Sequence, residues 1–400
     1  MKIALIKEGK LPADRRVAFT PKQLLAIQES YPNLSFKIEP SEVRSFDDEE
    51  YRSLGIEVNA DISDCDMMIG IKEVPISQLI PQKTFVFFSH TIKKQPFNRP
   101  LLKAVLAKQI RLIDYEVIKN EEGERLVAFG RWAGIVGAYN GLWTYGQKSG
   151  LYSIKRAFMC FDRVELEQEL SKVKLPPIKI VVTGTGRVGK GVVEVLLSAG
   201  VEQVDRQAFL TSYFDSPVFT VLSSADYNRR KTDGGFDRSE FHQDPSRYES
   251  HFLKFAEVSD ILMAAAYWDN RAPKLFNFAD IQSEDFNISV IADITCDIHG
   301  SIPTTIRASK VSDPVYDIDR ESFEEVPAFG KQHSISVMAI DNLPSELPRD
   351  ASEAFGDMLK QYFLPELTKE ASQIIRRATI AENGELTDDF LYLTDYVQGD

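Results

Sequence analysis

The stretch IKIVVTGTGRVGKGVVEVLLSAG, residues 178–200, decides the fold of this chain. Its first six residues are mostly apolar and β-branched, which predicts a buried strand, and residues 190–199 are expected to form a helix. Between the two, Gly184, Gly186 and Gly189 have the spacing G-x-G-x-x-G. In that position the first glycine permits a tight turn, the second admits a pyrophosphate, and the third lets the helix pack closely on the strand. The stretch therefore predicts a dinucleotide-binding turn.

The residues that follow the glycines bear on the choice between NAD and NADP. Arg187 and Val188 complete the turn at the start of the helix, where the phosphate charge is expected. A NAD site usually has an acid about 20 residues beyond the glycines, at the end of the second strand. Asp226 is the candidate, although it falls later than that spacing, and Arg229 follows it and could instead accept a 2′-phosphate. The expected cofactor is therefore NAD or NADP, with the choice open.

Short apolar runs alternate with helical stretches on both sides of the glycine motif. Runs that predict strands lie at 2–6, 35–38, 67–71, 84–88, 109–113, 218–222, 260–265 and 290–293. Strands that alternate with helices indicate βαβ units, so the expected fold is α/β with parallel sheets. Other expectations are helices at 21–31, within 131–160, at 351–364 and at 365–379, a long loop at 228–250, and a solvated helix with a frayed end at 380–400.

Composition excludes several classes of protein. The 400 residues are 43% hydrophobic, which is ordinary for a folded enzyme, and 60 acids against 47 bases give a net charge of −13. A general nucleic-acid binder normally shows the opposite balance, and no apolar run approaches the roughly 20 residues that span a bilayer. Three scattered cysteines do not form a disulfide framework or a zinc site. We expect a cytoplasmic protein that uses no metal, binds no nucleic acid and no membrane, and has an oligomeric state that stays open.

Three polar side chains follow the ends of predicted strands in the first third of the chain. Lys72, His90 and Glu116 each come just after an apolar run. Ligands of open α/β sheets bind beyond the carboxyl ends of the strands, so these side chains could converge on one site. Lysine, histidine and carboxylate together suit acid–base chemistry on an amine or imine. Arg16 lies in a loop before a helix and could anchor a substrate carboxylate through its bidentate guanidinium.

Several longer segments carry a resemblance to a known family. They are RVAFTP (16–21), IKEVP (71–75), FSHTIKKQ (88–95), LVAFGRWAG (126–134) and IDNLPSELPRDAS (340–352). The first two resemble the alanine dehydrogenase and transhydrogenase N-terminal superfamily. All five together resemble the lysine-forming saccharopine dehydrogenases and the lysine–ketoglutarate reductase domain of bifunctional lysine-degrading enzymes. The stretch 228–250 is longer than expected of the fungal members.

The resemblance implies an oxidoreductase that acts on CH–NH bonds. Such enzymes interconvert saccharopine with L-lysine and 2-oxoglutarate through an imine, using NAD(H) or NADP(H). Lys72 and His90 would be the acid–base groups, and Glu116 would tune the lysine. Substrate-binding residues would be Arg16, Glu73, Arg125 and Asp341. The alternatives are an alanine dehydrogenase-like amino-acid dehydrogenase and a non-catalytic NAD(P)-binding regulator.

The resemblance also implies a division into two Rossmann-like domains with a cleft between them. The dinucleotide-binding domain would span residues 136–329. A discontinuous substrate and catalytic domain would combine residues 1–135 with residues 330–400, so that the C-terminal segment completes the first domain. Its expected ligands are small molecules, an amino acid and a keto acid.

Overall fold

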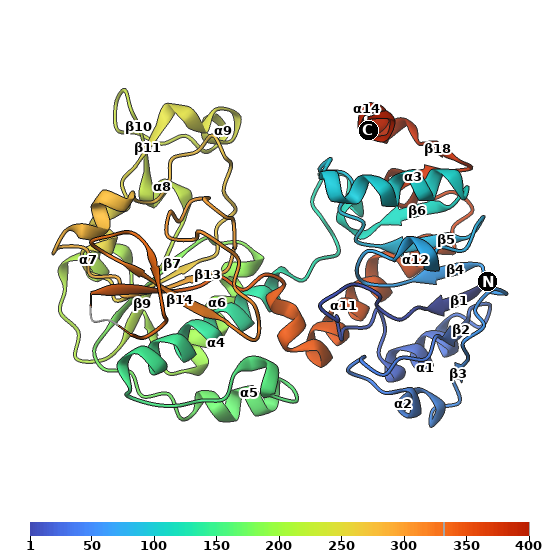
Figure 1. Cartoon of the computed structure of the whole chain (residues 1–400), viewed down its shortest axis with the longest axis horizontal. Coiled ribbons are helices and arrows are strands. Elements are labelled where there is room, and N and C mark those ends of the chain that lie inside the picture. The colour runs from blue at the N-terminus through green and yellow to red at the C-terminus, as the bar shows by residue number, and fades with distance from the viewer. Residues whose placement is uncertain (331–332, 400) are drawn as a thin grey trace. The chain divides into compact units, whose positions relative to one another are not determined.

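The computed structural model describes residues 1–330 and 333–399, which form two compact units (Figure 1). Unit 1 combines Met1–Phe129 with Pro348–Asp400, and unit 2 is Gly130–Leu347. Each unit contains an eight-stranded sheet that is mostly parallel, which confirms the expected α/β class. The boundary after Leu347 comes later than the expected one at residue 329, because Ser334–Met338 is a strand of the unit 2 sheet.

The sheet of unit 1 has the order β18-β17-β6-β5-β4-β1-β2-β3. Its strands are β1 (Lys2–Leu5), β2 (Ser35–Ile38), β3 (Glu57–Val58), β4 (Met67–Ile69), β5 (Thr84–Phe87), β6 (Arg111–Asp114), β17 (Thr379–Glu382) and β18 (Glu385–Leu386). Its helices are α1 (Pro21–Ser30), α2 (Asp48–Arg52), α3 (Arg99–Ala107), α11 (Pro348–Tyr362), α12 (Leu364–Leu367), α13 (Gln373–Ala378) and α14 (Thr394–Gln398). Both faces of the sheet are covered, so the central strands are buried throughout, as the near-continuous apolar runs predict.

The C-terminal segment completes unit 1, as Figure 1 shows for the red segment beside the blue and cyan strands. Strand β17 pairs antiparallel with β6 and makes the sheet mixed. The expectation of a solvated helix from residue 380 is therefore wrong, because Ile380 and Ala381 are buried in the core of unit 1. The expected second C-terminal helix, 365–379, is instead two short helices, α12 and α13.

The sheet of unit 2 has the order β15-β14-β16-β13-β12-β7-β9-β8. Its strands are β7 (Lys179–Thr183), β8 (Glu202–Gln203), β9 (Val218–Leu222), β12 (Ile261–Ala264), β13 (Val290–Asp293), β14 (Val315–Asp319), β15 (Glu325–Val326) and β16 (Ser334–Met338). Its helices are α4 (Gly130–Ser149), α5 (Arg163–Leu170), α6 (Arg187–Ser198), α7 (Arg206–Thr211), α8 (Ser224–Tyr227), α9 (Arg238–Gln243) and α10 (Leu253–Ala256). The strands β7, β9, β12 and β13 pair in parallel, and the glycine motif directly follows β7.

Helix α4 packs on α6 so closely that glycines are required at the contact. A Cβ added to Gly134 would lie 1.9 Å from the carbonyl oxygen of Val188, and one added to Gly191 would lie 2.1 Å from that of Arg131. The glycine-rich stretch near residue 131 is therefore a helix that packs tightly, as expected. It begins unit 2, whose glycine-motif helix α6 is its partner.

The expectation of a long loop at 228–250 is wrong. The segment begins and ends with an antiparallel pair, β10 (Asn228–Arg230) and β11 (Tyr248–Ser250), and α9 lies between them. We call residues 228–250 the hairpin. The rings of Phe236, Phe241 and Tyr248 pack against one another with centroids 5.1–5.3 Å apart. Three aromatic rings at irregular spacing give no strand or helix period, which is why the sequence pattern did not predict this small core.

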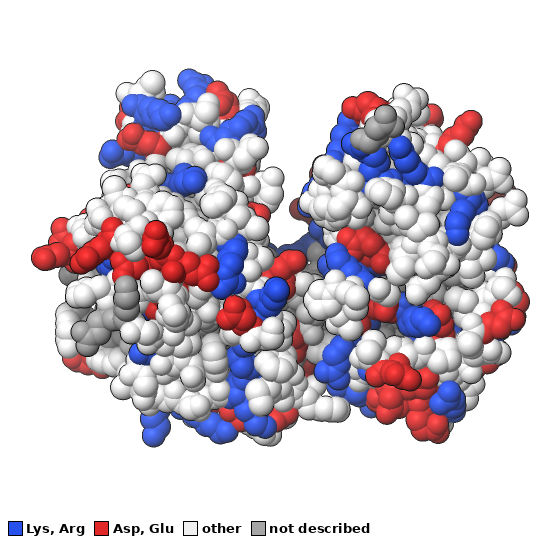
Figure 2. Space-filling view, viewed as in Figure 1, with Lys and Arg blue, Asp and Glu red and all other residues white. Residues whose placement is uncertain are grey.

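Acidic and basic side chains are interspersed on the face of the molecule drawn in Figure 2. Within residues 1–330 and 333–399, no helix combines the length and the apolar character needed to cross a membrane.

Candidate active site and dinucleotide pocket

The glycine turn of unit 2 has the geometry that a dinucleotide requires. Gly184 has a φ of +102°, and a Cβ there would lie 2.7 Å from the backbone of Ala265. Gly189 is equally constrained, since its Cβ would lie 1.9 Å from the carbonyl oxygen of Gly184. These two glycines are explained by the packing of the protein itself.

Gly186 is different, and its difference points to a ligand. Its φ of −79° is one that any residue adopts, and an added Cβ would meet no atom of the described residues within 4 Å. Neither the backbone nor the packing requires a glycine there. Open space at the N-terminus of the 12-residue helix α6 fits a pyrophosphate, because backbone N–H groups and the helix dipole favour an anion at that point.

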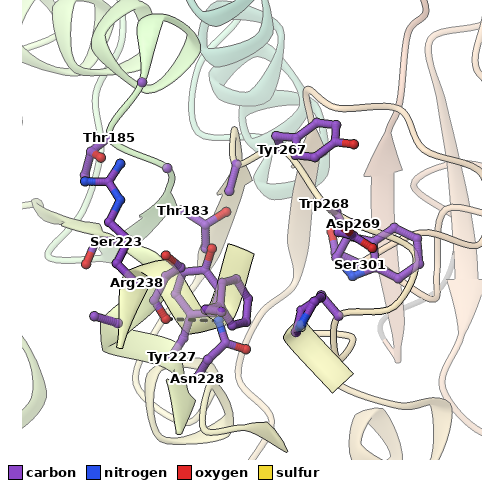
Figure 3. Close-up of a pocket in the computed structure, with 18 of the residues that line it drawn as sticks. Thr183, Thr185, Ser223, Tyr227, Asn228, Arg238, Tyr267, Trp268, Asp269 and Ser301 are labelled. Carbon is purple, nitrogen blue, oxygen red and sulfur yellow. Dashed lines mark hydrogen bonds between the residues drawn. The ribbon is translucent and has the colours of Figure 1, made fainter. Parts of the chain in front are cut away.

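A pocket of about 810 Å³ opens at this turn (Figure 3). Gly184, Gly186, Arg187 and Val188 line it, together with residues that follow β9 and β12 and residues of the hairpin. Its size is within the range of small-molecule and cofactor sites, roughly 300–1,000 Å³. Among the residues present, the turn, the helix start and the strand ends fit a bound dinucleotide, and they belong to one unit.

Asp226 and Arg229, predicted to choose the cofactor, are absent from the described residues that line this pocket. The Asp226 carboxylate accepts hydrogen bonds from the backbone nitrogen and Oγ of Ser223, at 2.7 and 2.8 Å, and pairs with Arg206. Arg229 pairs with Glu249 across the β10–β11 ladder, with 2.7 Å between Nε and Oε1. Their placement does not support a role for either residue in binding the ribose or its phosphate.

In unit 1, the carboxyl ends of β4, β5 and β6 carry Lys72, His90 and Glu116, as predicted from parallel strands. Burial lowers the pKa of Lys72, and the positive charge of Arg16 adds to this effect. No hydrogen bond or ion pair is recorded for the Lys72 ammonium group within the described part of the chain. A half-buried amine with a lowered pKa gives up its proton more readily than an ordinary lysine, and it can then accept a proton from a substrate.

His90 is held by Glu73. The Nδ1 atom of His90 lies 2.7 Å from Oε1 of Glu73, and Lys10 also contacts that carboxylate, at 2.9 and 3.1 Å. Burial raises the pKa of Glu73, but hydrogen bonds from His90 and Lys10 outweigh burial and bring that pKa to about 2. The ionised carboxylate fixes the proton on Nδ1 and leaves Nε2 for proton transfer. This placement supports an orienting role for Glu73 in place of the predicted substrate contact.

The backbone of His90 is strained. Its φ of +52° places a residue with a Cβ in the left-handed region, which is uncommon outside functional sites and tight turns. The buried Asp114 braces this turn, since it accepts hydrogen bonds from the backbone nitrogens of Ser89 at 2.9 Å and of Glu116 at 2.7 Å. One carboxylate therefore connects the two loops that carry His90 and Glu116.

Glu116 faces cations other than Lys72. Its Oε1 lies 3.3 Å from Nζ of Lys93 and 3.7 Å from Nη1 of Arg125. The charged groups with the largest effects on the pKa of Lys72 are Arg16, Asp14, Lys10 and Glu73, and Glu116 is not one of them. The geometry does not support the predicted tuning of Lys72 by Glu116. It fits a role in holding Arg125.

Arg16 and Arg125 lie over neighbouring aromatic rings. The Arg16 guanidinium is 4.2 Å from the centroid of Phe129, and that of Arg125 is 5.2 Å from Phe88. The ring centroids of Phe88 and Phe129 are 6.1 Å apart, so the two arginines predicted to bind carboxylates lie over neighbouring rings of one aromatic cluster. Asp14 contacts Arg16 through two bonds of 3.0 and 2.6 Å, which fixes the orientation of the guanidinium.

Sequence reasoning missed Glu8, Asp14 and Asp114. Glu8 follows β1 and accepts hydrogen bonds from the backbone nitrogens of Ile71 and Lys72, at 2.6 and 2.8 Å. A signal was present, since each of these acids lies at or just beyond the end of a parallel strand or beside the predicted Arg16. Asp341, predicted to bind substrate, belongs to unit 2 and follows β16 there, so its role stays a prediction.

Two relatives extend along almost the whole chain. The Mus musculus protein named alpha-aminoadipic semialdehyde synthase, mitochondrial, is 33% identical over 445 residues, which cover 98% of this chain and 47% of the mouse protein. The chain thus spans about half the length of that relative. The Yarrowia lipolytica protein named saccharopine dehydrogenase (NAD(+), L-lysine-forming) is 24% identical over 397 residues, which cover 94% of this chain and 95% of the yeast protein.

A solved structure and two family domains also match this chain. A solved structure of L-alanine dehydrogenase has a TM-score of 0.68 and 16% identity, over 99% of this chain and 100% of that one, which shows the same fold. The alanine dehydrogenase/PNT N-terminal domain matches residues 4–136, and the alanine dehydrogenase/PNT C-terminal domain matches residues 157–389. The resemblance seen in the sequence is confirmed, and this chain belongs to the alanine dehydrogenase/PNT family.

Proposed function

We propose that this chain is an NAD(P)-dependent oxidoreductase that interconverts saccharopine with L-lysine and 2-oxoglutarate. The observation that carries the proposal is the arrangement of Lys72 beside the His90–Glu73 pair at the strand ends of unit 1. The similarity to the Yarrowia lipolytica protein named saccharopine dehydrogenase (NAD(+), L-lysine-forming) supports the same reaction class. The glycine turn of unit 2 would hold the cofactor, and unit 1 would supply the groups that move protons.

Imine chemistry gives each of these groups a task. The ε-amino group of substrate lysine must lose a proton before it attacks a carbonyl carbon, and the partnerless Lys72 amine would accept that proton. The carbonyl oxygen must gain protons and leave as water. His90 would deliver them from Nε2 while the Glu73 carboxylate stabilises the charged imidazole.

The two arginines would position the substrates. Saccharopine and 2-oxoglutarate both carry two or more carboxylates, and guanidinium groups bind carboxylates with bidentate geometry. Arg125 is partly exposed over the ring of Phe88 and would present its guanidinium to one of these carboxylates, while Arg16 lies over the neighbouring ring, buried against Asp14, and would add positive charge behind it. When bound, the nicotinamide cofactor supplies or removes the hydride that interconverts the imine and the secondary amine.

A two-substrate assay tests the proposal. Oxidation of NADH and of NADPH is followed with L-lysine plus 2-oxoglutarate, and then with pyruvate plus ammonia. We expect oxidation with the first pair only, and a product with the mass of saccharopine. Oxidation with pyruvate and ammonia alone would support an alanine dehydrogenase-like enzyme, and the absence of oxidation with both pairs would support a non-catalytic binding protein.

A further inference from the structure

The hairpin carries five arginine and lysine side chains, and four of them have a partner within the protein. They are Arg229, Arg230, Lys231, Arg247 and Arg238. Arg229 pairs with Glu249, Arg230 with Asp233 and Glu240, and Arg247 with Glu240, while Lys231 donates to the carbonyl oxygen of Ser246. Arg238 is the remaining cation, and its guanidinium has no recorded partner anywhere in residues 1–330 or 333–399.

Arg238 lies in the wall of the dinucleotide pocket. It shares that wall with Thr185 of the glycine turn and with Ser223, the residue directly after β9. Figure 3 draws its side chain in the same part of the pocket as those two residues. In a Rossmann-type fold, the end of the second strand lies beside the ribose of the adenosine half. Arg238 is therefore on the side of the pocket where that ribose would bind.

The acidic side chains near Arg238 have hydrogen-bond or ion-pair partners other than Arg238. Asp226, which would repel a phosphate if it faced the ribose, is bound by Ser223 and Arg206 and lies outside the pocket lining. Two acids do line the pocket. Asp237 caps α9 through the backbone nitrogen of Glu240, and Asp269 pairs with Arg271 at 2.7 Å. Neither carboxylate forms an ion pair with Arg238 among the described residues, so an anion beside Arg238 would meet an unpaired positive charge.

We infer that Arg238 binds the 2′-phosphate of NADP(H), and that this chain prefers NADP(H) to NAD(H). A ribose phosphate has a charge of about −2 and several acceptor oxygens, which match the fork of an arginine. The hydroxyl-bearing Ser223 and Ser224 stand where a NAD site would place an acid, so they leave room for the phosphate without repelling it. The inference rests on the proposed dinucleotide site and adds the residue that would set its specificity.

Binding measurements on the full chain test the inference directly. Isothermal titration calorimetry with NADP⁺ and NAD⁺ would be made on the wild type, Arg238→Ala, Arg238→Lys and Arg229→Ala. We expect the wild type to bind NADP⁺ at least tenfold more tightly than NAD⁺. Arg238→Ala should weaken NADP⁺ at least tenfold and change NAD⁺ less than about twofold, and Arg238→Lys should fall between these results.

Arg229→Ala is the matched control, because Arg229 is an arginine of the same hairpin whose partner is a glutamate away from the pocket. It should leave both affinities unchanged. Equal loss of NAD⁺ and NADP⁺ affinity in Arg238→Ala would overturn the inference, as would a wild type that prefers NAD⁺. Activity with lysine and 2-oxoglutarate that uses only NADH would support the proposed function and contradict the inference about Arg238. Selective binding of NADP⁺ without that activity would support the inference and contradict the proposed function.

Discussion

At the scale of single residues, Lys72 is the most informative side chain to change. Lys72→Met keeps most of the volume and removes the amine, so a loss of rate is not explained by a cavity. A positioned acid or base contributes roughly 10²–10⁴-fold, and we expect kcat to fall by a factor in that range. Steady-state kinetics with lysine and 2-oxoglutarate provide the measurement. Lys22→Met, an exposed lysine on α1, is the control and should behave as the wild type.

Lys72 and His90 should also behave as one unit. Groups that act together lose less than the product of their separate effects when both are removed. We expect the double variant Lys72→Met/His90→Ala to be only slightly slower than the slower single variant. Multiplicative losses would mean that the two residues act in separate steps, and near-normal kcat in Lys72→Met would move the proton carriers to other groups.

Glu8 gives the protein a pH dependence of known sign. Burial, with Asp14 adding to it, raises the pKa of Glu8 to about 8. The folded chain thus keeps a proton that the unfolded chain releases above the ordinary carboxyl pKa near 4.5. Glu8 therefore lowers the free energy of unfolding progressively as the pH rises from that ordinary value to about 8, by at most about 1.4 kcal/mol per pH unit.

Glu8→Gln tests this sign. We expect the free energy of unfolding of the variant to fall less between roughly pH 5 and pH 8 than that of the wild type, as measured by urea denaturation at several pH values. The absolute value can shift at every pH, because glutamine has only one side-chain oxygen for the backbone nitrogens of Ile71 and Lys72. Parallel pH profiles for the two proteins would show that Glu8 is ionised in the folded state.

At the scale of elements, the glycine turn separates a ligand requirement from a packing requirement. Gly186→Val adds a side chain where the protein leaves open space, so we expect an unchanged melting temperature and a loss of dinucleotide binding of at least tenfold. Gly189→Val places a side chain against the carbonyl oxygen of Gly184, so we expect a lower melting temperature. Calorimetry and thermal unfolding give both readouts. Normal NADP⁺ and NAD⁺ affinity in Gly186→Val would remove the turn from the binding site.

The sequence predicted those elements whose pattern follows directly from burial. Strands β9 and β13 begin and end at the expected residues, because a parallel strand covered on both faces is mostly apolar along its length. Strand β2 also matches its expected bounds, through the alternating apolar residues Phe36 and Ile38. Strand β17 was missed because its four residues, TIAE, form only a short apolar run and acids dominate the stretch that follows. The hairpin was missed because its core is three aromatic rings with no regular period.

For the candidate site as well, some features could be predicted from the sequence and others could not. Parallel strands end at one edge of a sheet, so the positions of Lys72, His90 and Glu116 could be predicted from the order of apolar runs. Their partners could not, since the pairs Glu73–His90, Glu116–Arg125 and Asp226–Arg206 depend on side-chain directions that no periodicity encodes. The proposed role of Arg238 was missed for a related reason. Whether its guanidinium has a partner depends on which other cations pair with the acids of the hairpin, and the sequence pattern does not encode those pairs.

At the scale of the whole molecule, the path of the chain makes the two units unequal. Unit 2 is one continuous segment, whereas unit 1 needs both ends of the chain. Phe355 and Leu359 of α11, with Phe363 directly after that helix, belong to one core cluster of unit 1, and Ile380 belongs to another. Residues 1–129 alone would expose the surfaces that these side chains cover, and loss of buried side chains of this size typically destabilises by 2–5 kcal/mol each.

Fragments of the chain therefore provide the last test. They show which segments fold independently and whether unit 2 alone binds the dinucleotide. We expect residues 130–347, expressed alone, to fold and bind a dinucleotide, and residues 1–129 alone to remain unfolded. Residues 1–129 joined to 348–400 should fold, because Phe129 stacks on Phe355 with centroids 4.4 Å apart, and Pro348 is about 10 Å from Phe355 along α11. A flexible linker of about eight residues would span that distance. Circular dichroism and thermal melting report folding, and calorimetry with NADP⁺ reports binding. A folded 1–129 fragment, or a 130–347 fragment that folds without binding either dinucleotide, would contradict this assignment of roles to the two units.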